Sequence, residues 1–251
     1  MSLAETKAAQ VLDIIQNEFN VPLVDSSRGN MILAIARVFS EASFELHNSA
    51  TVTVGTGQAF ETLNEALAFY SQFFVKHDSE VVITLQLAAG YVMDEQVILS
   101  GGINLSFVKI TSVDAEVPID PAAITENVDS ELGFLGRAAF GVSRGCSAPL
   151  IDALFRFQSG GTGLIHGAFV IGAGSSINFV SGRGILDAPH DGILCVSGAK
   201  ANVTGGDFSG AGNYGLEVRR GGVIAADNIS SGTTQSQGGK KTTEHGVIFN
   251  K

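Results

Sequence analysis

Two acidic residues in the glycine-rich second half of the sequence are the candidates for catalysis. Asp191 and Glu217 fall in two similar segments, DGILCV (191–196) and YGLEVR (214–219). Stacked as neighbouring strands about 4.8 Å apart, these segments would place both carboxyl groups on one face. Glycoside hydrolysis requires such a pair, one protonated and one ionised. Asp before Gly is also a common turn residue, and Glu217 with Arg219 would also make an ordinary surface ion pair.

Binding of a saccharide asks less of the same region. A third segment, HGVIFN (245–250), aligns with the first two if the polar stretch 233–241 is an insertion. Asp191, Tyr214 and His245 then form one outward column, with Arg219 beside it. These four side chains, which can hydrogen-bond and stack on a sugar, are the predicted binding patch.

Other chemistries find less support in the residues. Lyase chemistry needs cations beside a base, and Arg219–Arg220, the only adjacent arginines, are the candidates. The histidines His166, His190 and His245 lack metal-ligand spacing. The sequence also lacks a nucleophile elbow and a dinucleotide fingerprint. No metal and no cofactor is predicted.

The elements that must position these residues are short strands separated by glycine turns. Eighteen of the 31 glycines lie within residues 160–232. In the aligned segments the apolar residues alternate with polar ones, as in half-buried strands: Ile193, Leu216 and Val247, then Cys195, Val218 and Phe249. Repeats of this size bury their apolar face only by stacking. We therefore predict an all-β fold, a parallel β-helix; a β-sandwich or jelly roll is the alternative.

The rest of the chain divides around that body. We expect a short N-terminal helical region at 1–50, for attachment or oligomerisation or folded back on the body. A first strand and a capping helix follow at 51–80, with Phe60 to Phe74 at helical spacing and a capping box at Thr62 and Glu65. The β-helix then occupies 81–251, with an acidic, proline-flanked loop excursion at 113–148. Because 251 falls inside an expected strand, we predict a C-terminally truncated chain.

Composition narrows the possible partners. The net charge of −10 argues against nucleic acid and against anionic membranes. Cys146 and Cys195 are expected to be reduced thiols, with Cys195 an inward filler. The sequence shows no signal-peptide pattern and no apolar run of transmembrane length, so we expect synthesis in a cytoplasm and no membrane insertion.

One stretch carries a family resemblance. Residues 54–67, VGTGQAFETLNEAL, resemble the step into the capping helix of the pectate-lyase-like, right-handed β-helix of bacteriophage tail spikes and tail fibres. The phrases LAAGY and LSFVKITS that follow resemble the first coils of those proteins. The resemblance covers about residues 50–251. It implies a homotrimer in the virion tail, assembled in the host cytoplasm and joined to other tail proteins through its N-terminal region. It also implies that the body recognises bacterial surface polysaccharide.

Three functions follow from these observations. The first is a trimeric tail-fibre or tail-spike subunit that binds surface polysaccharide. The second is a polysaccharide depolymerase, a glycoside hydrolase or lyase, on the same fold. The third is a structural shaft whose receptor-binding tip lies beyond Lys251.

Overall fold

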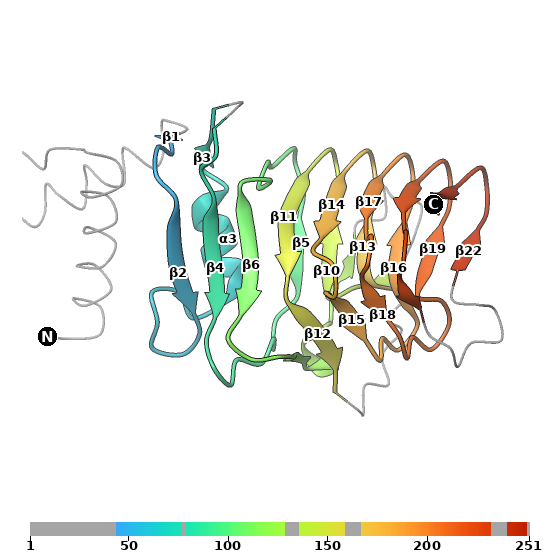
Figure 1. Cartoon of the computed structure of the whole chain (residues 1–251), viewed down its shortest axis with the longest axis horizontal. Coiled ribbons are helices and arrows are strands. Elements are labelled where there is room, and N and C mark those ends of the chain that lie inside the picture. The colour runs from blue at the N-terminus through green and yellow to red at the C-terminus, as the bar shows by residue number, and fades with distance from the viewer. Residues whose placement is uncertain (1–43, 77–78, 129–135, 159–166, 232–239, 250–251) are drawn as a thin grey trace, which may run out of the picture.

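The computed structural model describes residues 44–76, 79–128, 136–158, 167–231 and 240–249. Short strands lie side by side along one axis, with β2 near one end of the body and β22 at the other (Figure 1). The predicted helical residues 1–43 lie outside the described residues. Among the described residues, no helix is both long enough and apolar enough to span a membrane.

Three parallel sheets form the body. The eight-stranded sheet contains β2 (Ala50–Val54), β4 (Ile83–Leu87), β6 (Val108–Ser112), β11 (Ser147–Asp152), β14 (Ser176–Phe179), β17 (Lys200–Asn202), β20 (Val223–Ala225) and β23 (Val247–Phe249). The six-stranded sheet contains β5 (Val97–Leu99), β10 (Phe140–Val142), β13 (Gly167–Ile171), β16 (Asp191–Cys195), β19 (Leu216–Val218) and β22 (Lys240–Thr242). The five-stranded sheet contains β7 (Val117–Ile119), β12 (Leu154–Phe157), β15 (Gly184–Leu186), β18 (Asp207–Phe208) and β21 (Ser230–Ser231).

The chain visits these sheets in a fixed order. From β5 onward each pass, here called a winding, places one strand in the six-stranded sheet, the next in the eight-stranded sheet and the third in the five-stranded sheet. All pairing between windings is parallel; β8 (Asn127–Val128) and β9 (Gly136–Arg137) form the one antiparallel pair among the described strands. The predicted β-rich, parallel organisation is confirmed, and an antiparallel sandwich is excluded for this region.

The windings enclose a continuous apolar core because alternate strand residues point inward. On β16 and β19 the inward residues are fully buried, as the alternation predicted: Ile193, Cys195, Leu216 and Val218. An aromatic column follows the same interior, with Phe140 stacked on Phe169 at 4.6 Å between ring centroids. Phe179 meets Phe169 edge-on at 5.1 Å and Phe208 at 5.6 Å. Such aromatic pairs stabilise the fold by more than the apolar area they bury.

The corners between the six- and eight-stranded sheets are also stacked. Each has two successive residues with positive φ, and the second is a glycine in all but the last corner: Gly101–Gly102, Arg144–Gly145, Ala173–Gly174, Ser197–Gly198, Arg220–Gly221 and Glu244–His245. A backbone N–H of one corner donates to the carbonyl of the next, as from Gly198 to Arg220 at 3.3 Å. The corners therefore fix the winding-to-winding register.

This register corrects the alignment of the third segment. Leu216 pairs with Lys240 and Glu217 with Lys241, whereas Val247 pairs with Val223 in the eight-stranded sheet. The stretch 233–241 is therefore not simply an insertion, because its last residues form β22; 232–239 lie outside the described residues. The prediction failed because a Gly-apolar step precedes strands of both sheets, as Gly215–Leu216 does for β19 and Gly222–Val223 for β20.

Helix α3 (Leu63–Tyr70) covers the end of the body near β2 (Figure 1). Its buried stripe is Leu63, Ala66, Leu67 and Tyr70, and Thr62 accepts the Glu65 backbone N–H at 3.1 Å. The six-stranded sheet ends at β5 while β2 and β4 extend the eight-stranded sheet further, so an apolar surface is left at this step. The first turn of α3 bonds the residues just before β5, which places the helix over that step. The predicted helix is present, and Thr62 is its N-cap.

Two predicted boundaries differ from the structure. The helix stops at Tyr70, and Phe73–Phe74 forms β3, which pairs with β1 (Phe44–Glu45), a segment expected to be helical. The predicted loop at 113–148 contains β7 and β10 and the start of β11. Only the part between β7 and β10, with a 3-10 turn at Pro121–Ala123, leaves the windings. Pro118 was taken as a loop signal, but β7 is an edge strand, where proline is tolerated.

Candidate functional site

The predicted catalytic residues lie at an unusual point of the six-stranded sheet. On its outer face Val170, Leu194, Glu217 and Lys241 follow one another across adjacent strands. Val170 and Leu194 are fully buried in a small second apolar cluster with Ala138 and Val196. Glu217 continues this column and is also fully buried, so it is not the solvated side chain that its outward position suggested.

Glu217 is surrounded by donors. Arg219 binds it through Nε to Oε1 and Nη2 to Oε2, both at 2.9 Å. Lys241 Nζ lies 3.0 Å from Oε1, and the Asp191 side chain forms a further hydrogen bond. Burial alone would raise the pKa of Glu217, but these hydrogen bonds outweigh it and the pKa lies below its usual value. Glu217 is therefore a carboxylate in the folded protein.

Asp191 has the opposite electrostatic environment. Its side chain is 1% exposed, and Oδ1 accepts hydrogen bonds from Asn213 Nδ2 at 2.9 Å and from the Tyr214 backbone N–H at 3.2 Å. Oδ2 lies 3.0 Å from His190 Nδ1 but without hydrogen-bond alignment. Burial, with Glu217 adding to it, raises the pKa of Asp191 despite His190.

The two carboxyl groups therefore have pKa values shifted in opposite directions. Asp191 Oδ2 has no aligned hydrogen-bond partner, whereas both oxygens of Glu217 are bound by cations. Environments that separate two pKa values in this way can define an acid and a base. The geometry does not suit glycoside hydrolysis, since that chemistry needs carboxyl groups about 5 Å or more apart with the glycosidic bond between them. The pair is also closed to solvent, so it supports the architecture rather than a depolymerase.

Part of the predicted binding patch does come together at the rim of this pair. The Tyr214 backbone N–H donates to Asp191 Oδ1, and Arg219 binds the neighbouring Glu217 carboxylate. Lys241, which belongs to β22 rather than to an insertion, lies over the Tyr214 ring at 4.9 Å from the centroid. The side chains of Arg219 and Lys241 are 32% and 35% exposed, so their outer edges can meet a ligand. His245 is not part of this group, because it occupies the corner before β23.

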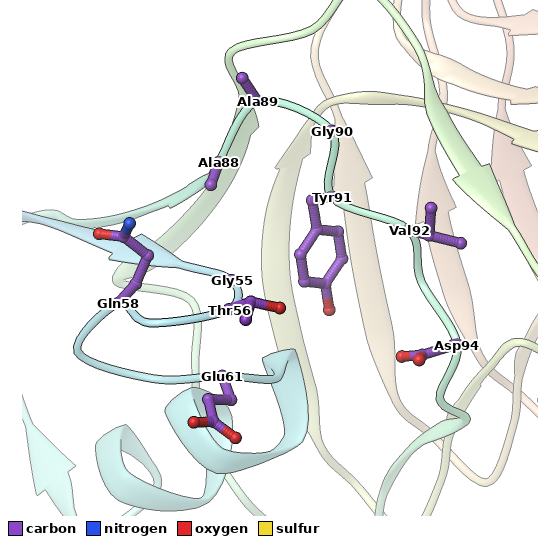
Figure 2. A pocket seen from close by; sticks show the side chains of 10 residues that line it. All are labelled: Gly55, Thr56, Gln58, Glu61, Ala88, Ala89, Gly90, Tyr91, Val92 and Asp94. Carbon is purple, nitrogen blue, oxygen red and sulfur yellow. The ribbon is translucent and has the colours of Figure 1, made fainter. Parts of the chain in front are cut away.

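A separate cleft of about 440 Å³ lies beside α3. The sequence reasoning did not predict it. It is formed by the turn after β2 and by the segment after β4: Gly55, Thr56, Gln58, Glu61, Ala88, Ala89, Gly90, Tyr91, Val92 and Asp94. Tyr91 lies between Thr56 and Asp94 (Figure 2). The available signal was the pair of glycine turns that follow adjacent parallel strands, because ligands commonly bind outside the carboxyl ends of such strands.

The described residues contain no group of three or more His, Cys, Asp or Glu side chains placed to hold a metal ion. Cys146 and Cys195 are both buried free thiols. Comparison with known protein families finds no matching family model. No curated protein matches the sequence.

Proposed function

We propose that this chain is a subunit of a bacteriophage tail spike or tail fibre that binds bacterial surface polysaccharide as a homotrimer. In this proposal the windings form a right-handed parallel β-helix. The observation that supports it most is the eight-stranded parallel stack with α3 at one end. Residues 54–67, which carry the family resemblance, run from the end of β2 into this helix. A stack of this kind provides a long, rigid surface, which suits recognition of a repeating polymer.

The outer face of the eight-stranded sheet also fits this role. Over its first three strands the outward residues are mostly uncharged and polar: Thr51, Thr53, Thr84 and Gln86, with a buried Thr111 hydroxyl and with Lys109 paired to Asp152. Hydroxyl and amide groups such as those of Thr51, Thr53, Thr84 and Gln86 can donate and accept hydrogen bonds with sugar hydroxyls or with a second copy of the chain.

The experiment is a binding assay with the intact chain and a panel of purified capsular and O-antigen polysaccharides. The proposal expects saturable binding to at least one polymer, with no loss of polymer length. Release of reducing ends or unsaturated sugars would instead assign a depolymerase. An absence of binding across capsule and O-antigen types would contradict the proposal.

A further inference from the structure

The cleft beside α3 is held open by a network that does not need a ligand. Tyr91, at 9% exposure, donates its hydroxyl to Glu95 Oε1 at 2.6 Å. The same carboxylate accepts the backbone N–H groups of Leu63 and Asn64 at 2.6 and 2.9 Å, in the first turn of α3. Carboxylates are favourable at a helix N-terminus. The rear wall of the cleft is therefore fixed to the helix, and the cleft is preformed.

The opposite wall is equally well fixed. Gly55 donates its backbone N–H to the Phe60 carbonyl at 2.8 Å, and Gly90 donates to Asp114 Oδ2 at 2.6 Å. A Cβ on Gly55 would lie 3.0 Å from the Ala88 Cβ, so the absence of a side chain keeps the two turns close together. Preorganised walls reduce the entropy lost on binding.

The lining residues determine which ligand fits. Thr56, Gln58, Glu61 and Asp94 provide a hydroxyl, an amide and two carboxylates, while none of the ten lining residues is Lys, Arg or His. Sugar hydroxyls can donate to the carboxylates and accept from the amide, and the volume is in the range of small-ligand sites. A uronate, sialate or phosphate group would meet like charge without a compensating cation.

We propose that this cleft binds a saccharide unit that carries no acidic group, and so restricts the polysaccharides that the chain accepts to neutral or amine-bearing repeats at this position. The inference rests on the proposed function, which it makes more specific. It concerns residues of the first windings and is independent of the Asp191–Glu217 pair.

The test is amide NMR of the intact chain with glucose, glucosamine and glucuronate, each at up to about 50 mM. Glucose and glucosamine should shift the amides of Gly55, Gly90 and their neighbours, and glucuronate should bind about tenfold more weakly or not at all. Asp94→Asn should reduce the preference for glucosamine over glucuronate. Ala89→Trp, which fills the cleft from an exposed position, should abolish the shifts, while Glu80→Gln, an exposed site outside the cleft, should not.

The outcomes separate this inference from the function beneath it. Equal or tighter binding of glucuronate, or no shift with any of the three sugars, would overturn the inference. If intact chain and Ala89→Trp retain the same polysaccharide affinity, the cleft is not the site although the proposed function stands. If the intact chain binds no polysaccharide but glucose shifts the cleft, the tail-spike function is wrong and the saccharide site remains.

Discussion

Neighbouring carboxyl groups Asp191 and Glu217 should respond very differently to the same isosteric change. Asp191→Asn removes a carboxyl group whose pKa is raised by burial, and its amide oxygen keeps the acceptor for Asn213 and for the Tyr214 backbone N–H. Glu217→Gln removes the negative charge that two cations share at 2.9 and 3.0 Å. The account therefore predicts a small effect for the first variant and a large one for the second.

The magnitude follows from the burial of the partners. Removing one member of a fully buried ion pair costs about 3 to 5 kcal/mol. Arg219 and Lys241 are 32% and 35% exposed and can recover part of their hydration, so we expect a loss of about 2 to 3 kcal/mol for Glu217→Gln. That loss should lower Tm by about 5 to 10 °C. Asp191→Asn should not destabilise the chain at neutral pH, because it removes a carboxyl group whose pKa is raised in the folded protein.

The assay is urea unfolding at neutral pH, with hydrogen exchange on the backbone amides of β16 and β19 as a local readout. Exchange distinguishes opening of these windings from global unfolding, since stacked repeats can open locally. Lys109→Met, which removes a cation that pairs with Asp152 elsewhere on the body, is a matched control for loss of one ion-pair partner. If Asp191→Asn destabilises as much as Glu217→Gln, the two carboxyl groups do not have opposite electrostatic environments and the account is wrong.

Four further predictions follow from the same structure. Because the folded pKa of Asp191 is raised, the stability it contributes is present at low pH and lost as pH rises through that pKa; Asp191→Asn should gain stability relative to the native chain as pH rises above about 4, the unfolded pKa of Asp, in urea titrations. Burial raises the pKa of the Cys195 thiol, so Ellman's reagent should not react with it until urea unfolds the chain, and rapid native-state labelling would refute its placement. Phe169→Ala should cost about 3 to 5 kcal/mol, against less than about 1 kcal/mol for the 43%-exposed Phe74→Ala. Gly198→Ala, with open space but φ +74°, should cost about 1 to 2 kcal/mol, whereas Gly192→Ala places a Cβ 2.6 Å from the Gly215 carbonyl and should cost about 3 kcal/mol or more in the same denaturation assay.

Much of the fold was accessible from local patterns. Period-2 alternation located β16 and β19 and their inward residues, because burial on the inner face is the strongest constraint on a strand. The Thr62 cap identified the start of α3, because an N-cap requires a specific side-chain acceptor. Both signals depend on residues close together in the chain.

The features that were missed depend on contacts between windings. Gly246–Val247 matches Gly222–Val223 as well as it matches Gly215–Leu216, so the sequence could not decide which strand it forms. The alternation of apolar and polar residues implies that the outer face of a strand is exposed to solvent. It therefore could not show that Glu217 is buried. The cleft joins two segments that are 27 or more residues apart, 55–61 and 88–94, and the pairing of β2 with β4 brings them together.

The molar mass of the intact chain in solution, measured by light scattering, tests the central claim most directly. A tail-spike or tail-fibre subunit is expected as a homotrimer at three times the 26.0 kDa of one chain, and a version that starts near Ser49 should remain trimeric if the contacts run along the windings. A monomer for the intact chain at every concentration examined would contradict the proposed assembly.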